Sequence, residues 1–276
     1  SLDADVVFVD VGTAPREFVF DALLMSDLPI LMTQPEPSAL EQMVRGGARR
    51  RRRTQSLPQI RVEVVHGDLR ESKAPVLVGH YIGDGIISAE SALDRMHNGR
   101  MRGRHQLGQY PGPIGTAEVF LSEDHKVPGA IVVGLGAVGE LSLGDLVSAV
   151  AAGLQRYAAL VAEQPSARPA AGVVKLRVAV LLVGTCAGGL GVADALMAIL
   201  RGARQAALVV RQSVYGTQVR FESLEILELY EDRAIQAAHT LHRLGKLPEF
   251  DQQFDVAATC RSTETGWRRA SFEEGH

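Results

Sequence analysis

Short apolar runs alternate along this chain with longer segments in which apolar residues recur at helical spacing. The apolar runs predict strands at 5–11, 28–32, 61–65, 75–80, 116–121, 130–134, 176–183 and 219–229. The helical spacing predicts helices at 14–25, 88–97, 142–163, 192–211 and 233–244. Because strands and helices alternate, the pattern is typical of an α/β fold. We predict a three-layer structure, in which a mixed and mainly parallel sheet carries helices on both faces.

A glycine cluster separates a buried strand from the helix that follows it. Gly184, Gly188, Gly189 and Gly191 leave backbone N–H groups uncovered at the positive end of that helix, an arrangement that binds anions. The same glycines are also compatible with a tight structural turn. The pattern therefore indicates either a phosphate-binding loop or a turn without a ligand.

The chain divides into three predicted segments. A β-α-β unit at 3–45 is followed by an arginine-rich linker at 46–59 and by the main α/β domain at 60–273. The five consecutive arginines Arg49–Arg53 repel one another and cannot be buried, so they form an exposed linker or contact an anion. No aromatic residues are interleaved with them to stack on bases, which argues against nucleic acid.

Composition limits the classes of protein to which this chain can belong. The chain has 276 residues, and 46% of them are hydrophobic, which predicts a globular protein with a substantial core. Its net charge of -3 gives no overall attraction to nucleic acid or anionic membranes. No apolar run is long enough for a membrane span. The two cysteines, Cys186 and Cys260, do not make a disulfide framework, and we expect a cytoplasmic protein.

Neither a cofactor nor a metal ion is predicted. The run GLGAVG at 134–139 matches G-x-G-x-x-G, but the next strand does not end in the acidic residue that a dinucleotide site requires. His239 and His242 lie one helical turn apart without a third ligand nearby, so we interpret them as surface histidines.

Two local features complete the prediction for the middle of the chain. Ser88 is placed at the start of helix 88–97, with the Glu90 carboxylate near its positive end. The segment 100–115 is rich in arginine, glycine and proline and has no period. It is predicted to be a long loop that serves as a lid.

Three separated pieces of the sequence together resemble the macro-domain superfamily, to which the N-terminal domain of leucyl aminopeptidases is structurally related. They are VVHGDLRESKAPVLVGHYIGDG at 64–85, IVVGLGAVGELS at 131–142, and Gly184-Thr185 with the glycine cluster after it. The resemblance covers 60–244.

The resemblance implies a ligand site as well as a fold. It implies that Asp68 meets an adenine amino group, that Gly83 and Gly85 belong to a ligand loop, and that 184–191, including Thr185, wraps a diphosphate. Asp68 is equally compatible with the role of a turn or helix-cap acid. In place of the family's Asn-Ala-Ala-Asn-like run the chain has Val-Gly-His-Tyr at 78–81, which argues against ADP-ribose hydrolysis.

A second resemblance concerns the setting of the domain. The runs HYIGDGIISAESALD at 80–94 and QLGQYPGPIGTAEVF at 106–120 resemble uncharacterised regions that precede caspase-like CHAT domains in large bacterial proteins. This resemblance implies an accessory role beside neighbouring domains of a longer chain.

These observations support one main hypothesis and two alternatives. The main hypothesis is a non-catalytic accessory domain of a larger bacterial protein, which binds a small phosphate-containing ligand or regulates a neighbouring domain. The first alternative is a cysteine hydrolase, because Gly-Thr-Cys-Ala-Gly at 184–188 places Cys186 on a strand-to-helix turn of the G-x-nucleophile-x-G form. The second is a pure docking scaffold, in which helix 142–163 or 233–244 contacts other domains.

Overall fold

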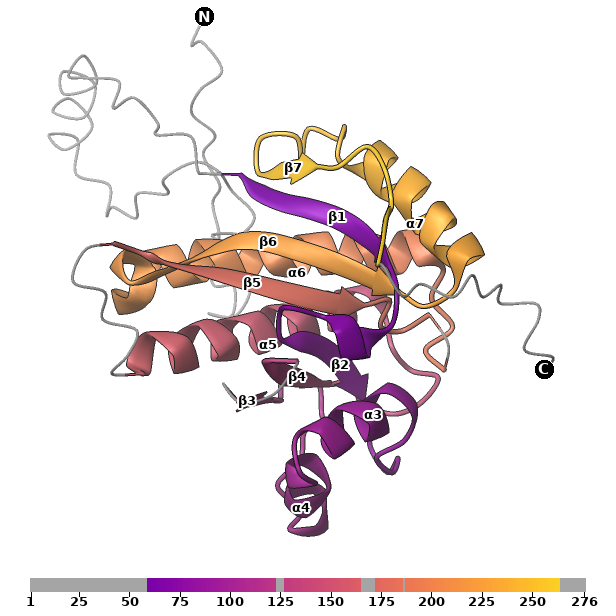
Figure 1. Ribbon diagram of the computed structural model, residues 1–276, viewed down its shortest axis with the longest axis vertical. Helices are drawn as coiled ribbons and strands as arrows, with labels where there is room; N and C mark the ends of the chain where they lie inside the picture. Colours follow the sequence, from indigo (N-terminus) through magenta and orange to yellow (C-terminus); the bar gives the residue numbers. More distant parts are fainter. Residues whose placement is uncertain (1–58, 123–126, 165–171, 186, 264–276) are drawn as a thin grey trace, which may run out of the picture. The chain divides into compact units, whose positions relative to one another are not determined.

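The computed structural model describes residues 59–122, 127–164, 172–185 and 187–263 (Figure 1). All of them belong to the second of the two units into which the chain divides, Ser56–His276. The predicted β-α-β unit at 3–45, the arginine run Arg49–Arg53 and Cys186 lie outside the described residues.

The described residues form an eight-stranded sheet with the order β3-β4-β2-β5-β6-β1-β7, and β8 pairs with β1. Every pairing is parallel except that of β3 with β4. The strands are β1 (Ile60–His66), β2 (Val76–His80), β3 (Ala117–Leu121), β4 (Gly129–Gly134), β5 (Val174–Leu181), β6 (Val219–Glu228), β7 (Phe254–Val256) and β8 (Arg261–Ser262). The sheet is mixed and mainly parallel, which confirms the prediction.

Helices cover both faces of this sheet. They are α3 (Ser88–Met96), α4 (Arg100–Gln106), α5 (Leu143–Glu163), α6 (Val192–Gln212) and α7 (Glu231–Leu244), with short 3-10 turns η1 (Leu69–Glu71) and η3 (Val214–Thr217). Successive strand residues point to opposite faces, so Leu77 belongs to the apolar cluster that includes residues of α5, α6 and α7, while Val76 and Val78 belong to the cluster on the other face with Leu93 of α3 and Met101 of α4. The result is the predicted three-layer arrangement, which Figure 1 shows.

The middle of the chain differs from the prediction at two points. The segment 100–115 is not a continuous loop, because it begins with the helix α4. Ser88 does not cap α3: the N-cap is Ile87, which makes no side-chain cap hydrogen bond, and Ser88 itself has a left-handed φ of 46°. The carboxylate that the sequence places in the first turn, Glu90, is buried.

The parallel strands bring four chain segments to one edge of the sheet. β1 ends before η1, β2 before the loop 81–87, β5 before the glycine cluster and β6 before α7. None of the helices in the described ranges combines the length and the apolar character that a membrane span requires. The carboxyl edge of the sheet is where open α/β folds usually hold their ligands.

Candidate functional site

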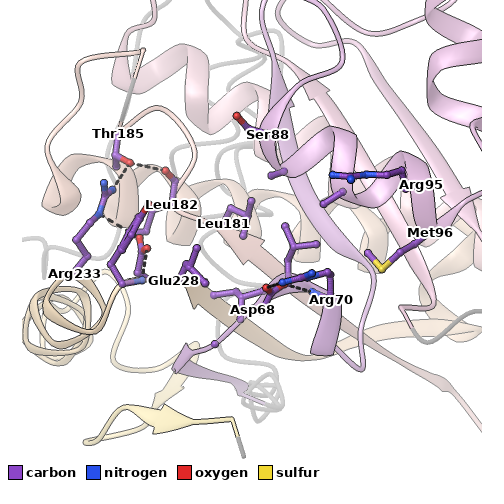
Figure 2. A pocket seen from close by; sticks show the side chains of 17 residues that line it. Asp68, Arg70, Ser88, Arg95, Met96, Leu181, Leu182, Thr185, Glu228 and Arg233 are labelled. Atoms are coloured by element: carbon purple, nitrogen blue, oxygen red, sulfur yellow. Dashed lines mark hydrogen bonds and ion pairs between the residues drawn. The ribbon is translucent and has the colours of Figure 1, made fainter. Parts of the chain in front are cut away.

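A cavity of about 770 Å³ lies at the carboxyl ends of β1, β5 and β6, between α3 and the start of α7 (Figure 2). This volume falls in the range of small-molecule sites. The cavity is lined by Gly67, Asp68, Leu69, Arg70, Ser88, Ala89, Ala92, Arg95, Met96, Leu181, Leu182, Thr185, Leu227, Glu228, Leu229, Tyr230 and Arg233.

Apolar side chains make up much of the cavity wall. β5 and the residue after it supply Leu181 and Leu182, β6 supplies Leu227, and α3 supplies Ala92 and Met96. Leucine and methionine side chains at the end of buried strands can pack against the flat face of an aromatic ring. The cavity therefore has an apolar surface that suits a nucleobase or a similar ring.

One side of the cavity holds a polar network around Arg233. Its Nη2 donates a hydrogen bond to Thr185 Oγ1 at 2.7 Å, and its Nε lies 3.3 Å from Glu228 Oε2. Glu228 also accepts from the backbone N–H of Tyr230 at 3.1 Å, and the Thr185 hydroxyl donates to the Leu182 carbonyl at 2.8 Å. These contacts fix the Arg233 guanidinium beside Thr185, as the left of Figure 2 shows.

A second polar group comes from η1. Asp68 is the N-cap of this turn and accepts from the backbone N–H of Arg70 at 2.9 Å. The Arg70 side chain turns back onto the same carboxylate, with Nε 2.9 Å from Oδ1 and Nη2 bonded to Oδ2. This contact raises the pKa of the exposed Arg70 guanidinium.

Arg95 on α3 completes the charged lining of the cavity. Its Nε donates to the Ser91 carbonyl at 3.2 Å, and among the described residues no carboxylate is paired with it. The lining thus carries three guanidiniums and two carboxylates, a net charge of one positive unit. The cavity as a whole favours an anionic ligand.

The glycine cluster lies next to this cavity rather than in its lining. Gly184 and Gly189 adopt left-handed φ values of 85° and 66°, and Leu190 N–H donates to the Gly184 carbonyl at 3.0 Å. A Cβ on Gly188 would lie 2.5 Å from the Tyr81 hydroxyl, so only glycine fits there. Gly191 is the N-cap of α6 and makes no side-chain cap bond.

The structure therefore separates the residues that the sequence singled out. Asp68 and Thr185 line the cavity together. The others do not line it: Gly83, Gly85, Gly184, Gly188, Gly189 and Gly191. The sequence reasoning missed Arg70, Arg95, Glu228 and Arg233. A carboxylate at the end of the apolar run of β6 was the one visible signal for Glu228.

A buried cluster behind the cavity holds α3 in place. His80, at the end of β2, has its Nδ1 3.1 Å from each oxygen of the Glu90 carboxylate. The Tyr110 hydroxyl donates to Glu90 Oε1 at 2.8 Å, and the rings of His80 and Tyr110 meet edge to face at 4.8 Å between centroids. Burial, together with the Glu90 charge, raises the pKa of Tyr110, so its hydroxyl remains a donor. The cluster fixes the helix that forms one wall of the cavity.

Replacing Tyr110 with phenylalanine tests this cluster. We expect a loss of about 2 kcal/mol in the free energy of unfolding, because the buried Glu90 carboxylate would lose a charge-assisted hydrogen bond. Urea denaturation measures it. Tyr215→Phe is the matched control: its exposed hydroxyl donates to Glu163, and we expect a change within about 0.5 kcal/mol. Equal effects of the two substitutions would contradict the role of the cluster.

Solved structures that resemble this chain include macrodomains. The Oceanobacillus iheyensis macrodomain with ADP is 15% identical, with a TM-score of 0.42, and the match covers 66% of this chain and 90% of that one. The Trypanosoma brucei macrodomain in complex with ADP is 11% identical, with a TM-score of 0.44 and coverages of 65% and 68%. The macro domain of ganglioside induced differentiation associated protein 2 is 12% identical, with a TM-score of 0.45 and coverages of 70% and 86%.

Likenesses this distant assign no residue of the present chain a role. No family model matches the sequence, and no curated protein matches it either. The cavity and its side chains are therefore the features from which a function can be inferred.

The two histidines that the sequence analysis weighed as metal ligands, His239 and His242, lie on α7. His239 and His242 line a hollow of about 290 Å³ together with Cys260. Burial raises the pKa of the Cys260 thiol, so it is not activated as a nucleophile. Within the described ranges, no group of three or more histidine, cysteine, aspartate or glutamate residues could hold a metal ion.

Proposed function

We propose that this domain binds a small phosphate-bearing ligand of the nucleoside diphosphate class in the cavity, without catalysing a reaction. One observation carries the proposal. Apolar side chains of β5, β6 and α3 line the same cavity as Arg95 and the Arg233–Thr185 pair, and the lining has an excess of positive charge. A nucleotide offers the matching features, an aromatic ring and a phosphate chain.

The proposal gives roles to the residues that the sequence singled out. Thr185 and Asp68 contact the ligand from the lining. Gly184, Gly188, Gly189 and Gly191 hold the loop that carries Thr185 and offer backbone N–H groups to the phosphates. Gly83 and Gly85 belong to the loop after β2 that approaches the ligand, and Gly83 has a left-handed φ of 85°, which favours glycine.

A binding role is supported over hydrolysis by the state of His80. The ring is buried and bound to Glu90, in the run that replaces the family's asparagine-containing segment. It therefore serves to fix α3 and is not available to a reacting group. The hypothesis of a cysteine hydrolase remains a prediction from the sequence, because Cys186 lies outside the described residues.

The biological setting is part of the proposal. We place the α/β domain, 60–273, in a cytoplasmic bacterial protein as an accessory module, following a β-α-β unit at 3–45 and a linker at 46–59. In this setting the neighbouring domains, including a CHAT domain, are its protein partners, and ligand binding regulates them. The support is the sequence resemblance to regions beside CHAT domains and to the leucyl aminopeptidase N-terminal domain.

A thermal-shift panel tests the proposed ligand class. ADP-ribose, ADP and inorganic pyrophosphate are titrated into the wild type, Arg95→Ala and the control Arg211→Ala at the far end of α6. A ligand at a hundred times its Kd adds about 2.7 kcal/mol to stability, which raises Tm by about 5–10 °C in a domain of this size. We expect this shift in the wild type and the control and a clear reduction in Arg95→Ala. No shift with any compound in folded protein would overturn the proposal.

A further inference from the structure

The sheet has a notch at its amino edge, between residues 73–75 ahead of β2 and residues 174–178 of β5 (Figure 1). β5 starts at Val174, but its first residue to pair with β2 is Ala179, which lies opposite Val76. On this side the residues 174–178 therefore have no partner strand within the described part of the chain. A strand edge of this kind can pair with another chain.

The register shows which backbone groups of β5 face the notch. The Ala179 N–H donates to the Pro75 carbonyl at 2.9 Å, so it points to the β2 side. Backbone groups of alternate residues in a strand point to the same side. Lys175 and Arg177 therefore turn their N–H and C=O groups into the notch, where they form a row of two donors and two acceptors.

A hollow of about 300 Å³ lies at this notch. Its lining includes Lys73 and Pro75 ahead of β2, Lys175 and Arg177 of β5, and Tyr157 of α5. The volume is at the lower end of the range of small-molecule sites. It can therefore take a short stretch of extended chain.

The side chains of the hollow are cationic. Its lining holds Lys73, Lys175 and Arg177 and, as far as the chain is described, no carboxylate. Lys175 Nζ lies 2.6 Å from Glu222 Oε1 and Arg177 Nη2 lies 3.0 Å from Glu225 Oε1, so two of the charges are paired outside the lining. Lys73 is exposed and forms no ion pair with a described residue. The notch thus keeps one positive charge in excess, which favours an acidic ligand.

A tyrosine hydroxyl adds a further donor. Tyr157 is only 7% exposed, and its hydroxyl makes no hydrogen bond to a described residue. Burial raises the pKa of Tyr157 to about 12, so the hydroxyl stays protonated. The residue belongs to the apolar core and also lines the hollow, so the hydroxyl at the tip of its side chain is available to an acceptor of a ligand.

We propose that the notch binds an extended acidic segment of a partner protein, which adds a short strand beside the amino half of β5. This site lies at the opposite edge of the sheet from the cavity of the proposed function. An inorganic anion would use the free N–H groups but leave the free C=O groups unpaired, whereas a peptide main chain satisfies both. The cations of the lining select acidic over basic side chains.

Fluorescence anisotropy of labelled, capped peptides tests this inference on the full chain. The acidic probe is a pentapeptide that alternates valine with glutamate, the basic probe has lysine in place of glutamate, and a third probe is the acidic peptide with every main-chain amide methylated. We expect the acidic probe to bind, the basic probe to bind at least about tenfold more weakly, and the methylated probe not to bind. Equal binding of the acidic and basic probes, or no binding of the acidic probe at about 1 mM, would overturn the inference.

Two variants test whether the peptide occupies the notch. Lys175→Pro removes an N–H that faces the notch and is not used in pairing with β6, and Lys73→Glu reverses the free charge. Each should weaken binding of the acidic probe about fivefold or more, while Lys246→Glu, at an exposed lysine after α7, should bind as the wild type does. Melting curves check folding, and Lys73→Glu decides the test if the proline variant does not fold.

Two further results would place the acidic segment elsewhere. Arg95→Ala should bind the acidic probe as the wild type does, because Arg95 lines the other cavity. Loss of binding in Arg95→Ala with unchanged binding in Lys73→Glu would place the peptide in that cavity and overturn the inference. A dimer in solution that excludes the acidic probe would mean that a second copy occupies the notch, and it would overturn the inference as well.

Discussion

Gly202→Val should destabilise the domain by about 3 kcal/mol, because α5 and α6 are in backbone contact at this residue. A Cβ on Gly202 would lie 2.8 Å from the Val147 carbonyl oxygen and 2.8 Å from Val150 Cβ. The oxygen belongs to a helix backbone, which cannot move without shifting α5 against the sheet. Urea denaturation followed by circular dichroism measures the loss.

Gly103→Ala is the matched control for this substitution. Gly103 lies inside α4, and a Cβ there would meet no atom within 4 Å. Alanine should therefore raise stability by about 1 kcal/mol through its higher helix propensity. If Gly202→Val, like Gly103→Ala, did not lower the free energy of unfolding, that result would contradict the close contact of α5 with α6 at Gly202.

The second large effect is expected at Arg233. Arg233→Ala leaves the Glu228 carboxylate, which is only 8% exposed, without its cation. We expect a loss of about 2 kcal/mol in stability. We also expect a Kd for ADP about thirtyfold higher, since a charged donor beside Thr185 is gone. Denaturation and calorimetry give the two values.

A double variant separates the two consequences. Adding Glu228→Gln to Arg233→Ala removes the buried charge, so most of the lost stability should return, while ADP affinity stays low. Recovery of affinity along with stability would mean that Arg233 acts only through folding. It would contradict direct contact with the ligand.

The sequence predicted the long elements well and the short ones poorly, for a physical reason. Strands such as β4 and helices such as α5 bury whole faces, so their apolar periods are clear. The helix α4 buries only Met101, and its N-terminus is held by Asp94, whose carboxylate accepts from the Arg102 N–H at 3.0 Å. That cap joins two different helices, and no local pattern reveals it.

The residues of the candidate site also differ in whether they could be named from the sequence. Asp68 and Thr185 were named through the resemblance to the macro-domain superfamily, and no pattern of the sequence alone singles them out. Arg233 meets Thr185 across 48 residues of sequence, and only the pairing of β5 with β6 brings the two together. Arg95 could not be distinguished from any other surface residue of an amphipathic helix. The helical period predicts which residues are exposed, but it does not predict that one of them lines a cavity.

Calorimetric titration of ADP-ribose into the wild type and Ala92→Trp is the most direct test of the central claim that this cavity binds the ligand. Ala92 is half-buried in the wall formed by α3, so an indole there would fill the space; Gln236→Trp on the exposed side of α7 is the control. We expect binding to the wild type and to the control, with binding weakened about a hundredfold or lost in Ala92→Trp. Unchanged affinity in a folded Ala92→Trp protein would mean that the ligand binds outside this cavity.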